Sequence, residues 1–394
     1  MVSGLVGRSA AIFFYAGDFA DVLQRHAAGK QQIYATHDEV ARLISDLRSA
    51  NIRVTIYSYV TETAKDEEPL DGVRVISLGA TGANRGVLKA AVATVDADTI
   101  VAHFAYPELL NAAIKSGKRV FAVLANSYNE PGLKQSLRRW RIARILNNGR
   151  IRMVSNHCVP ATEHLARIGV ARRKLIPWDV PHRFRPADYA AKHLTAKDTY
   201  EVAYAGSISE LKGVGDLIRA IALLRSQGLQ LRASFAGLGD IDKMQALGDS
   251  LGVKGHLNFR GIIGNDDVLA MFKDADIVVV PSRTAYPEGF PLTMFEALAS
   301  RSPIVCTDHP MFRPILTDGS NCCAFPSGDV EGFAGALRRV LSSPSLYRQL
   351  SESALETWTA LNGPADWRTL LITWITEGEH STWLARHTLE SIRS

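Results

Sequence analysis

Two glutamates eight positions apart, Glu288 and Glu296, are the strongest candidates for chemistry in this chain of 394 residues. They lie in the stretch Pro281–Val305, which reads PSRTAYPEGFPLTMFEALASRSPIV. The position of Glu288 at the tip of a loop would project its carboxylate into a ligand site. A carboxylate at Glu296, in the helix that follows, could accept two hydrogen bonds from a vicinal diol. Charge-assisted hydrogen bonds of this kind contribute about 1.5–3 kcal/mol each.

The elements around this pair predict a turn that binds anions. The apolar run Ile277–Pro281 predicts a buried strand, and a helix is expected from about Pro291, since proline suits the first helical turn. Free N–H groups in such a loop and first turn attract phosphate or sugar oxygens, helped by the helix dipole. Here they would belong to Gly289, Phe290 and Leu292. The same spacing also fits an ordinary turn with Glu296 in solvent, and that alternative stays open.

Along the whole chain, short β-rich runs alternate with segments of helical period such as His37–Ser49, Gly215–Leu224 and Asn265–Asp274, the last capped by Asn265. Runs such as IVVVP are continuously apolar, which is typical of parallel strands covered by helices on both faces. The alternation restarts near residue 200, after the proline-containing stretch Pro177–Lys197. The sequence therefore predicts a doubly wound α/β fold in two domains joined by a linker. We expect domains over residues 1–185 and 186–365, and a helical segment over residues 366–394 that packs back on the first domain.

The composition fits a globular protein, with 46% apolar and 22% charged residues and a net charge of +5. It excludes collagen-like and disordered classes. The four cysteines show no C-x-x-C spacing, so a disulfide framework and a structural zinc site are not expected and a reducing compartment fits best. No apolar run approaches the roughly 18 residues of a membrane span, and we expect a cytoplasmic protein.

The Glu288/Glu296 pair, followed by EALAS and PIV, resembles the signature of retaining glycosyltransferases of the GT-B fold, the large family four (group 1). Residues 200–345 carry further similar segments in the same order. They are AGSISELKG (Ala205–Gly213), FAGLGD (Phe235–Asp240), FRGII (Phe259–Ile263) and DADIVVVPS (Asp274–Ser282). The resemblance implies two Rossmann-like domains facing across a cleft. It also implies transfer of a sugar, with retention, from a UDP-sugar or GDP-sugar in the second domain to a glycan, lipid-linked or small-molecule acceptor in the first. A bound metal or cofactor is not expected.

Carried over position by position, the resemblance gives roles to individual residues. Glu296 would bind the ribose hydroxyls, Glu288 would hold the donor sugar beside the reacting centre, and Lys212 would bind the diphosphate as a point charge. Gly206 would let the backbone approach the phosphates, and Ile263 would hydrogen-bond the base through its backbone. The expected lining of the donor site is completed by Ser207, Gly289, Phe290, Pro291 and Leu292.

Several positions match the family pattern only in part. Ser207 stands where the family usually has arginine, and losing an electrostatic donor of this kind often costs about 3–4 kcal/mol of transition-state stabilisation. Arg283 is the candidate replacement, with a solvated loop arginine as the alternative. His103 resembles a catalytic histidine of the family, although a structural role stays open. Asn126 stands where a second histidine is usual, and Gly29 begins a loop with only part of the expected glycine pattern, so both are candidates for acceptor or phosphate contacts.

The stretch Leu133–Arg152 carries seven cations and no acidic residue. Lys134, Arg138 and Arg141 share one helical face, beside a face with Leu133, Leu137 and Trp140. Such a helix can lie on an anionic membrane or attract a phosphate-bearing acceptor, and a solvated face of a core-packed helix is the third alternative. We therefore expect peripheral contact with the inner membrane face, and no nucleic-acid partner because no recognition motif accompanies the cations.

Two other functions remain open at this stage. A non-catalytic donor-binding subunit of a glycosylation complex would explain Ser207 and Asn126, but it leaves Glu288, Lys212 and Glu296 without a reason to be present together. A nucleotide-sugar epimerase shares the fold but needs an acid–base pair that the sequence does not identify.

Overall fold

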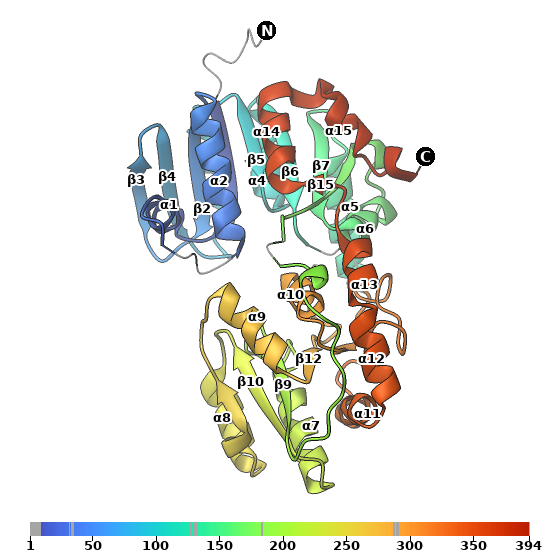
Figure 1. The fold of residues 1–394 in the computed structure, drawn as a ribbon. Coiled ribbons are helices and arrows are strands. Elements are labelled where there is room, and N and C mark those ends of the chain that lie inside the picture. The colour runs from blue at the N-terminus through green and yellow to red at the C-terminus, as the bar shows by residue number, and fades with distance from the viewer. Residues whose placement is uncertain are drawn as a thin grey trace. The chain divides into compact units, whose positions relative to one another are not determined.

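The computed structural model describes residues 9–393, apart from residues 31, 33–34, 127, 129–131, 183, 287 and 289–290. The chain forms two compact units (Figure 1). Unit 1 contains the chain up to Pro181 and returns from Gly363 onward, and unit 2 is His182–Asn362. The chain therefore crosses from one unit to the other twice, and the C-terminal segment belongs to the first unit.

Unit 1 is built on a nine-stranded sheet in the order β15-β8-β7-β6-β5-β1-β2-β4-β3. Among these strands only β3 runs antiparallel to its neighbour. Buried runs such as VFAVL in β6 agree with the prediction of parallel strands covered on both faces. The strands are β1 Ser9–Ala16, β2 Arg53–Val60, β3 Ala64–Leu70, β4 Val73–Ala80, β5 Thr99–Ala102, β6 Arg119–Leu124, β7 Ile151–His157, β8 Leu175–Asp179 and β15 Ala365–Asp366.

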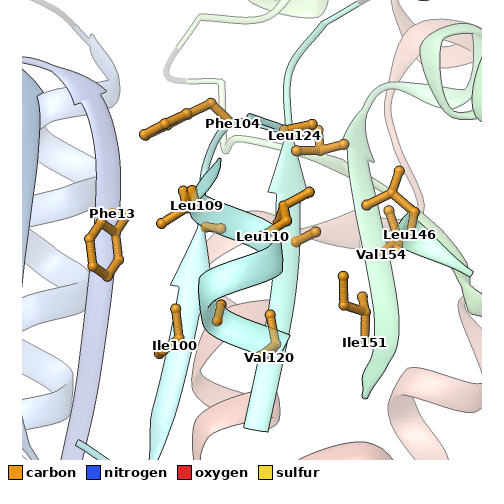
Figure 2. Close-up of a cluster of buried hydrophobic side chains, with 14 of the residues drawn as sticks. Phe13, Ile100, Phe104, Leu109, Leu110, Val120, Leu124, Leu146, Ile151 and Val154 are labelled. Atoms are coloured by element: carbon orange, nitrogen blue, oxygen red, sulfur yellow. The ribbon is translucent and has the colours of Figure 1, made fainter. Parts of the chain in front are cut away.

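Helices cover both faces of this sheet. On one face, Leu109 and Leu110 pack against the strands together with Leu146 (Figure 2), and these side chains are fully buried. On the other face, α2 and α14 lie side by side (Figure 1) and are joined by an ion pair of 3.2 Å between Arg368 and Asp46. The helices are α1 Phe19–Ala27, α2 Ala35–Ser49, α3 Gly86–Ala93, α4 Pro107–Lys115, α5 Leu133–Leu146, α6 Val159–Arg167, α14 Trp367–Glu377 and α15 Thr382–Arg386.

Unit 2 has a six-stranded parallel sheet in the order β11-β10-β9-β12-β13-β14. Its strands are β9 Tyr200–Ala205, β10 Leu231–Ala236, β11 Leu257–Phe259, β12 Ile277–Val280, β13 Ile304–Thr307 and β14 Cys323–Phe325. Its helices are α7 Val214–Ser226, α8 Ile241–Ser250, α9 Asn265–Asp274, α10 Leu292–Ala299, α11 Val330–Leu341, α12 Pro344–Glu352 and α13 Ala354–Leu361. The predicted doubly wound α/β architecture is confirmed in both units.

Some local predictions were wrong. Pro177 does not open the linker, because it lies in β8 opposite Asn156 of β7. Asn265 does not cap α9; it is the first residue of that helix, and Gly264 occupies the capping position without a side chain to contribute. The helix expected from about Pro291 is confirmed as α10, which begins at Leu292 with Pro291 as its N-terminal capping residue. No helix among the described residues is long and apolar enough to cross a membrane.

Candidate functional site

The candidate donor residues of unit 2 gather at one edge of its sheet. Strand β9 ends at Ala205 and leads into Gly206, and β12 ends at Val280 and leads into the loop that carries Glu288. The two strands are paired neighbours, with Ile277 opposite Val202. Because the strands are parallel, their carboxyl ends meet at the same edge, which is where open α/β sheets bind ligands.

Glu288 forms the centre of this group. Its side chain is buried, and its Oε1 atom accepts hydrogen bonds from Lys212 Nζ and from Ser282 Oγ, each at 2.5 Å. Lys212 Nζ also lies 4.2 Å from the centroid of the Tyr286 ring, in a cation–π contact. The structure thus joins two residues that the sequence singled out separately, and their opposite charges compensate each other inside the protein.

A buried histidine holds the loop that carries Glu288. The backbone N–H of Glu288 donates to the Tyr286 carbonyl at 2.8 Å, and the same carbonyl lies 3.1 Å from His309 Nε2. The backbone N–H of Met311 donates to His309 Nδ1 at 3.2 Å, so Nε2 carries the ring proton and donates to Tyr286. Burial lowers the pKa of His309, which keeps the ring in this neutral form. Sequence reasoning missed His309, although it lies just beyond the carboxyl end of a predicted strand.

Glycines allow the loop after β9 to approach its surroundings closely. Gly206 has φ near 146°, and a Cβ atom there would lie 2.9 Å from the Tyr204 hydroxyl. That hydroxyl donates to the Ser207 carbonyl at 2.7 Å, and burial raises the pKa of Tyr204. Gly213 has φ near 74°, and a Cβ atom there would overlap the Pro281 carbonyl. A side chain at either glycine would therefore distort the loops that position Lys212.

Arg283 has a partner inside unit 2. Its Nε donates to Asp216 Oδ2 at 2.8 Å and its Nη2 to Asp216 Oδ1 at 2.6 Å, a two-bond pairing with a buried carboxylate. The hydrogen bonds that Arg283 donates to Asp216 raise the pKa of Arg283. Because Asp216 compensates this charge, the geometry favours a structural role for Arg283 over replacement of the family arginine at Ser207. The phosphate role stays a prediction.

Glu296 differs from Glu288 in its surroundings. It lies on α10 and is half-buried, and its carboxyl group receives no hydrogen bond from the described residues. Burial raises the pKa of its carboxyl to about 7. Pro291 and Leu292 begin the same helix, Ile263 lies in the loop between β11 and α9, and the predicted lining residues Gly289 and Phe290 lie outside the described residues.

The three candidates of unit 1 have different environments. His103 follows β5, its ring stacks on Phe14 with centroids 4.4 Å apart, and Trp367 lies 5.6 Å away. Burial lowers the pKa of His103 to about 3, so its ring is neutral at physiological pH. Asn126 follows β6 and is exposed. Gly29 lies between α1 and α2, beyond a helix that the sequence did not predict.

Comparisons with known proteins agree on the fold. The solved structure of sucrose-phosphate synthase from Thermosynechococcus elongatus superposes with a TM-score of 0.66 at 18% identity, covering 94% of this chain and 98% of that one. The Anabaena protein HepE, solved with UDP-glucose, gives a TM-score of 0.62 at 14% identity over 94% of this chain and 98% of its own.

Sequence relatives match less than half of this chain. A D-inositol 3-phosphate glycosyltransferase of Saccharomonospora viridis is 32% identical over 187 residues, which are 44% of this chain and 43% of the relative. The alpha-D-kanosaminyltransferase of Streptomyces kanamyceticus is 26% identical over 48% of this chain and 52% of its own length. The chain therefore spans only about half the length of the curated relatives it matches, or less. It has the GT-B fold of two Rossmann-like domains, and its residues 187–357 match the family of group 1 glycosyl transferases.

Proposed function

We propose that this protein is a retaining glycosyltransferase that moves a sugar from a nucleotide sugar to an acceptor hydroxyl. The observation that carries the proposal is the cluster of Lys212, Glu288 and Ser282 at the carboxyl edge of the unit 2 sheet. This cluster lies within the residues that match the glycosyl transferase family. The UDP-glucose bound to HepE supports a UDP-sugar as the donor, with a GDP-sugar as the second choice.

In this proposal the loops of unit 2 hold the donor by its charges. Lys212 would exchange its contact with Glu288 for the donor diphosphate, supplying positive charge where the leaving group develops negative charge, without a metal ion. The exchange would free Glu288 to accept hydrogen bonds from the donor sugar. N–H groups at the start of α10, with the close backbone at Gly206, would contact the phosphates.

The ribose and the proton transfer involve further groups. Glu296 would accept hydrogen bonds from the two ribose hydroxyls in its ionised form, which requires that the carboxyl lose its proton near pH 7. In retaining transfer on one face of the sugar, the departing phosphate can take the acceptor proton. A side-chain base is then not required, which is consistent with Asn126 standing where the family usually has a histidine.

Helix α5 supports a membrane-associated acceptor. Leu133, Leu137 and Trp140 are 91%, 58% and 56% exposed, and their spacing places them on one stripe of the helix. Apolar side chains flanked by cations favour an anionic membrane surface. We propose that the protein works at the inner membrane face, on a lipid-linked or other glycan acceptor of polysaccharide or glycoconjugate synthesis. Free, buried cysteines fit the reducing compartment that this location implies.

The first test is calorimetric titration with UDP, GDP and ADP, followed by an assay for slow hydrolysis of the corresponding sugar nucleotides. Micromolar binding of one nucleotide is expected. Glu288→Gln should abolish hydrolysis of its sugar conjugate, whereas the matched variant Glu331→Gln, at an exposed residue of α11, should retain it. Full hydrolysis by Glu288→Gln would contradict the assigned site.

One observation keeps a second function in view. Arg283 is committed to Asp216, so the described residues show no evident replacement for the arginine missing at Ser207. A donor-binding subunit without activity of its own would tolerate that loss. Tight nucleotide binding without hydrolysis or transfer to any tested acceptor would favour this alternative.

A further inference from the structure

Unit 1 contains a pocket of about 360 Å³ that the proposed reaction does not use. Ser136, Arg139 and Trp140 of α5 line it, with His164 and Arg167 of α6 and with Tyr128 from the segment before α5. The pocket therefore lies between two helices of the same unit. It adjoins the exposed apolar stripe of α5, because Trp140 belongs to both.

The charged groups of this pocket suit an anion. Arg139 and Arg167 are its charged lining residues, and no acidic side chain among the described residues lines it. The nearby carboxylate of Glu163 is held by Arg172 through two hydrogen bonds of 2.8 and 2.9 Å. Arg139 Nη2 donates to Ser136 Oγ at 2.8 Å, which places a guanidinium beside a hydroxyl. Guanidinium groups bind phosphate oxygens in pairs of parallel hydrogen bonds.

A buried hydroxyl adds a further donor. The Tyr128 hydroxyl is buried and has no hydrogen-bond partner among the described residues. Burial raises the pKa of Tyr128, so the group keeps its proton and can donate it to an oxygen. Buried polar groups are almost always hydrogen-bonded in native proteins. A ligand oxygen in the pocket would supply the missing acceptor.

We propose that this pocket binds the phosphate monoester headgroup of an anionic lipid. Arg139, Arg167 and Tyr128 would supply donors to the terminal oxygens of the phosphate, while the Ser136 hydroxyl, which donates to the Gly132 carbonyl at 3.1 Å, would keep accepting from Arg139. The lipid source follows from the neighbouring stripe, since Leu133, Leu137 and Trp140 expose apolar surface that a headgroup carrying acyl chains would cover and a soluble phosphate would not. This inference rests on the membrane contact proposed above and adds a specific lipid headgroup to it.

The test compares binding of the whole protein to two kinds of phosphatidylcholine vesicle, one with phosphatidate and one with phosphatidylserine, by co-sedimentation. Removing one surface cation should weaken binding to both kinds by about fivefold. Arg139→Gln and Arg167→Gln should lose a further factor of roughly ten on phosphatidate vesicles only. The matched control is Arg141→Gln, which removes the same charge from the exposed side of α5 outside the pocket, and it should show only the general loss. Tyr128→Phe should reduce the preference for phosphatidate and leave binding to phosphatidylserine unchanged.

The outcomes separate the possible failures. If Arg139→Gln, Arg167→Gln and Arg141→Gln all lower binding equally on both vesicles, the pocket assignment is wrong and only a general membrane contact remains. If the parent protein binds neither vesicle, the membrane contact and the headgroup both fail, and binding of glycerol 3-phosphate under those conditions would show a soluble ligand instead. Glu288→Gln should bind vesicles like the parent, so the transferase proposal is judged independently by donor hydrolysis.

Discussion

Replacing Lys212 with methionine should destabilise unit 2 strongly, because the change leaves the Glu288 carboxylate buried without its cation. The Lys212 and Glu288 side chains are only 14% and 6% exposed, and their charged atoms are 2.5 Å apart. Removing one partner of a buried ion pair typically costs about 3–5 kcal/mol. For a unit of this size, 1 kcal/mol lowers Tm by about 2–4 °C. The expected fall is therefore about 6–20 °C, measured by differential scanning calorimetry of the whole chain.

A double variant distinguishes the ion pair from simple loss of packing. In Lys212→Met with Glu288→Gln, no buried charge lacks a partner, so the double variant should be less destabilised than the two single variants added together. The control is Lys254→Met, which breaks an exposed pair of 2.9 Å with Asp249 and should cost about 0–1 kcal/mol. If the sum of the two single-variant losses of stability equals the loss in the double variant within about 0.5 kcal/mol, Lys212 and Glu288 are not energetically coupled and the reasoning fails.

Three further predictions follow from the same unit. UDP affinity should increase as pH rises through about 7, because only the ionised carboxyl of Glu296 accepts hydrogen bonds from both ribose hydroxyls, and Glu296→Gln should bind UDP with no such pH dependence. The pKa of Glu296 is raised in the folded protein, so its ionisation should lower the stability of the parent progressively as pH rises from about 4.5 to about 7. Thermal melts of Glu296→Gln should lack this decline. His309→Phe should lower kcat for donor hydrolysis more than it weakens UDP binding and should cost about 1–3 kcal/mol of stability. Because the pKa of His309 is lowered in the folded protein, the stability difference between the parent and His309→Phe should shrink as pH falls below 6.5, and a difference that stays constant in melts over that range would contradict the neutral ring. Arg283→Gln should lower stability by about 1–3 kcal/mol through Asp216 and leave UDP affinity unchanged, and a marked loss of UDP affinity in calorimetry would instead assign Arg283 to the phosphates.

The elements of the fold that could be predicted from the sequence are those whose structure is determined by the residue types within the element itself. Buried parallel strands such as β12 consist of consecutive apolar residues, and that composition is visible without a structure. Strand β3, with the sequence AKDEEPL, has no apolar pattern and forms as an exposed edge strand paired with β4. Strand β15 has only two residues and forms because it pairs with the edge of β8. Such elements depend on their partners, so local pattern does not predict them.

The candidate site divides in the same way. Glu288 and Glu296 were recognised as a pair, and Lys212 separately, because they belong to segments that resemble known motifs. The hydrogen bond between Lys212 and Glu288 joins residues 76 positions apart, and the spacing gave no indication that they touch. His309 acts through the Tyr286 carbonyl, a backbone contact that residue types do not reveal. Sequence reasoning therefore found charged groups and missed the contacts that fix their protonation and position.

The return of the chain to unit 1 at Gly363 has a consequence for the order of events on the ribosome. The residues of unit 2, roughly 180 in number, are made between the two parts of unit 1. At roughly 5–20 residues per second, the first part waits roughly 10–40 s for β15 and α14 to be translated. During that interval β8 lacks β15 as its strand partner on one edge. The surface of the sheet that later buries Leu370, Leu371 and Trp374 of α14 is still exposed. The second unit in sequence can thus finish folding before the first, and a chain that ended at Asn362 would contain every residue of unit 2 but only part of unit 1.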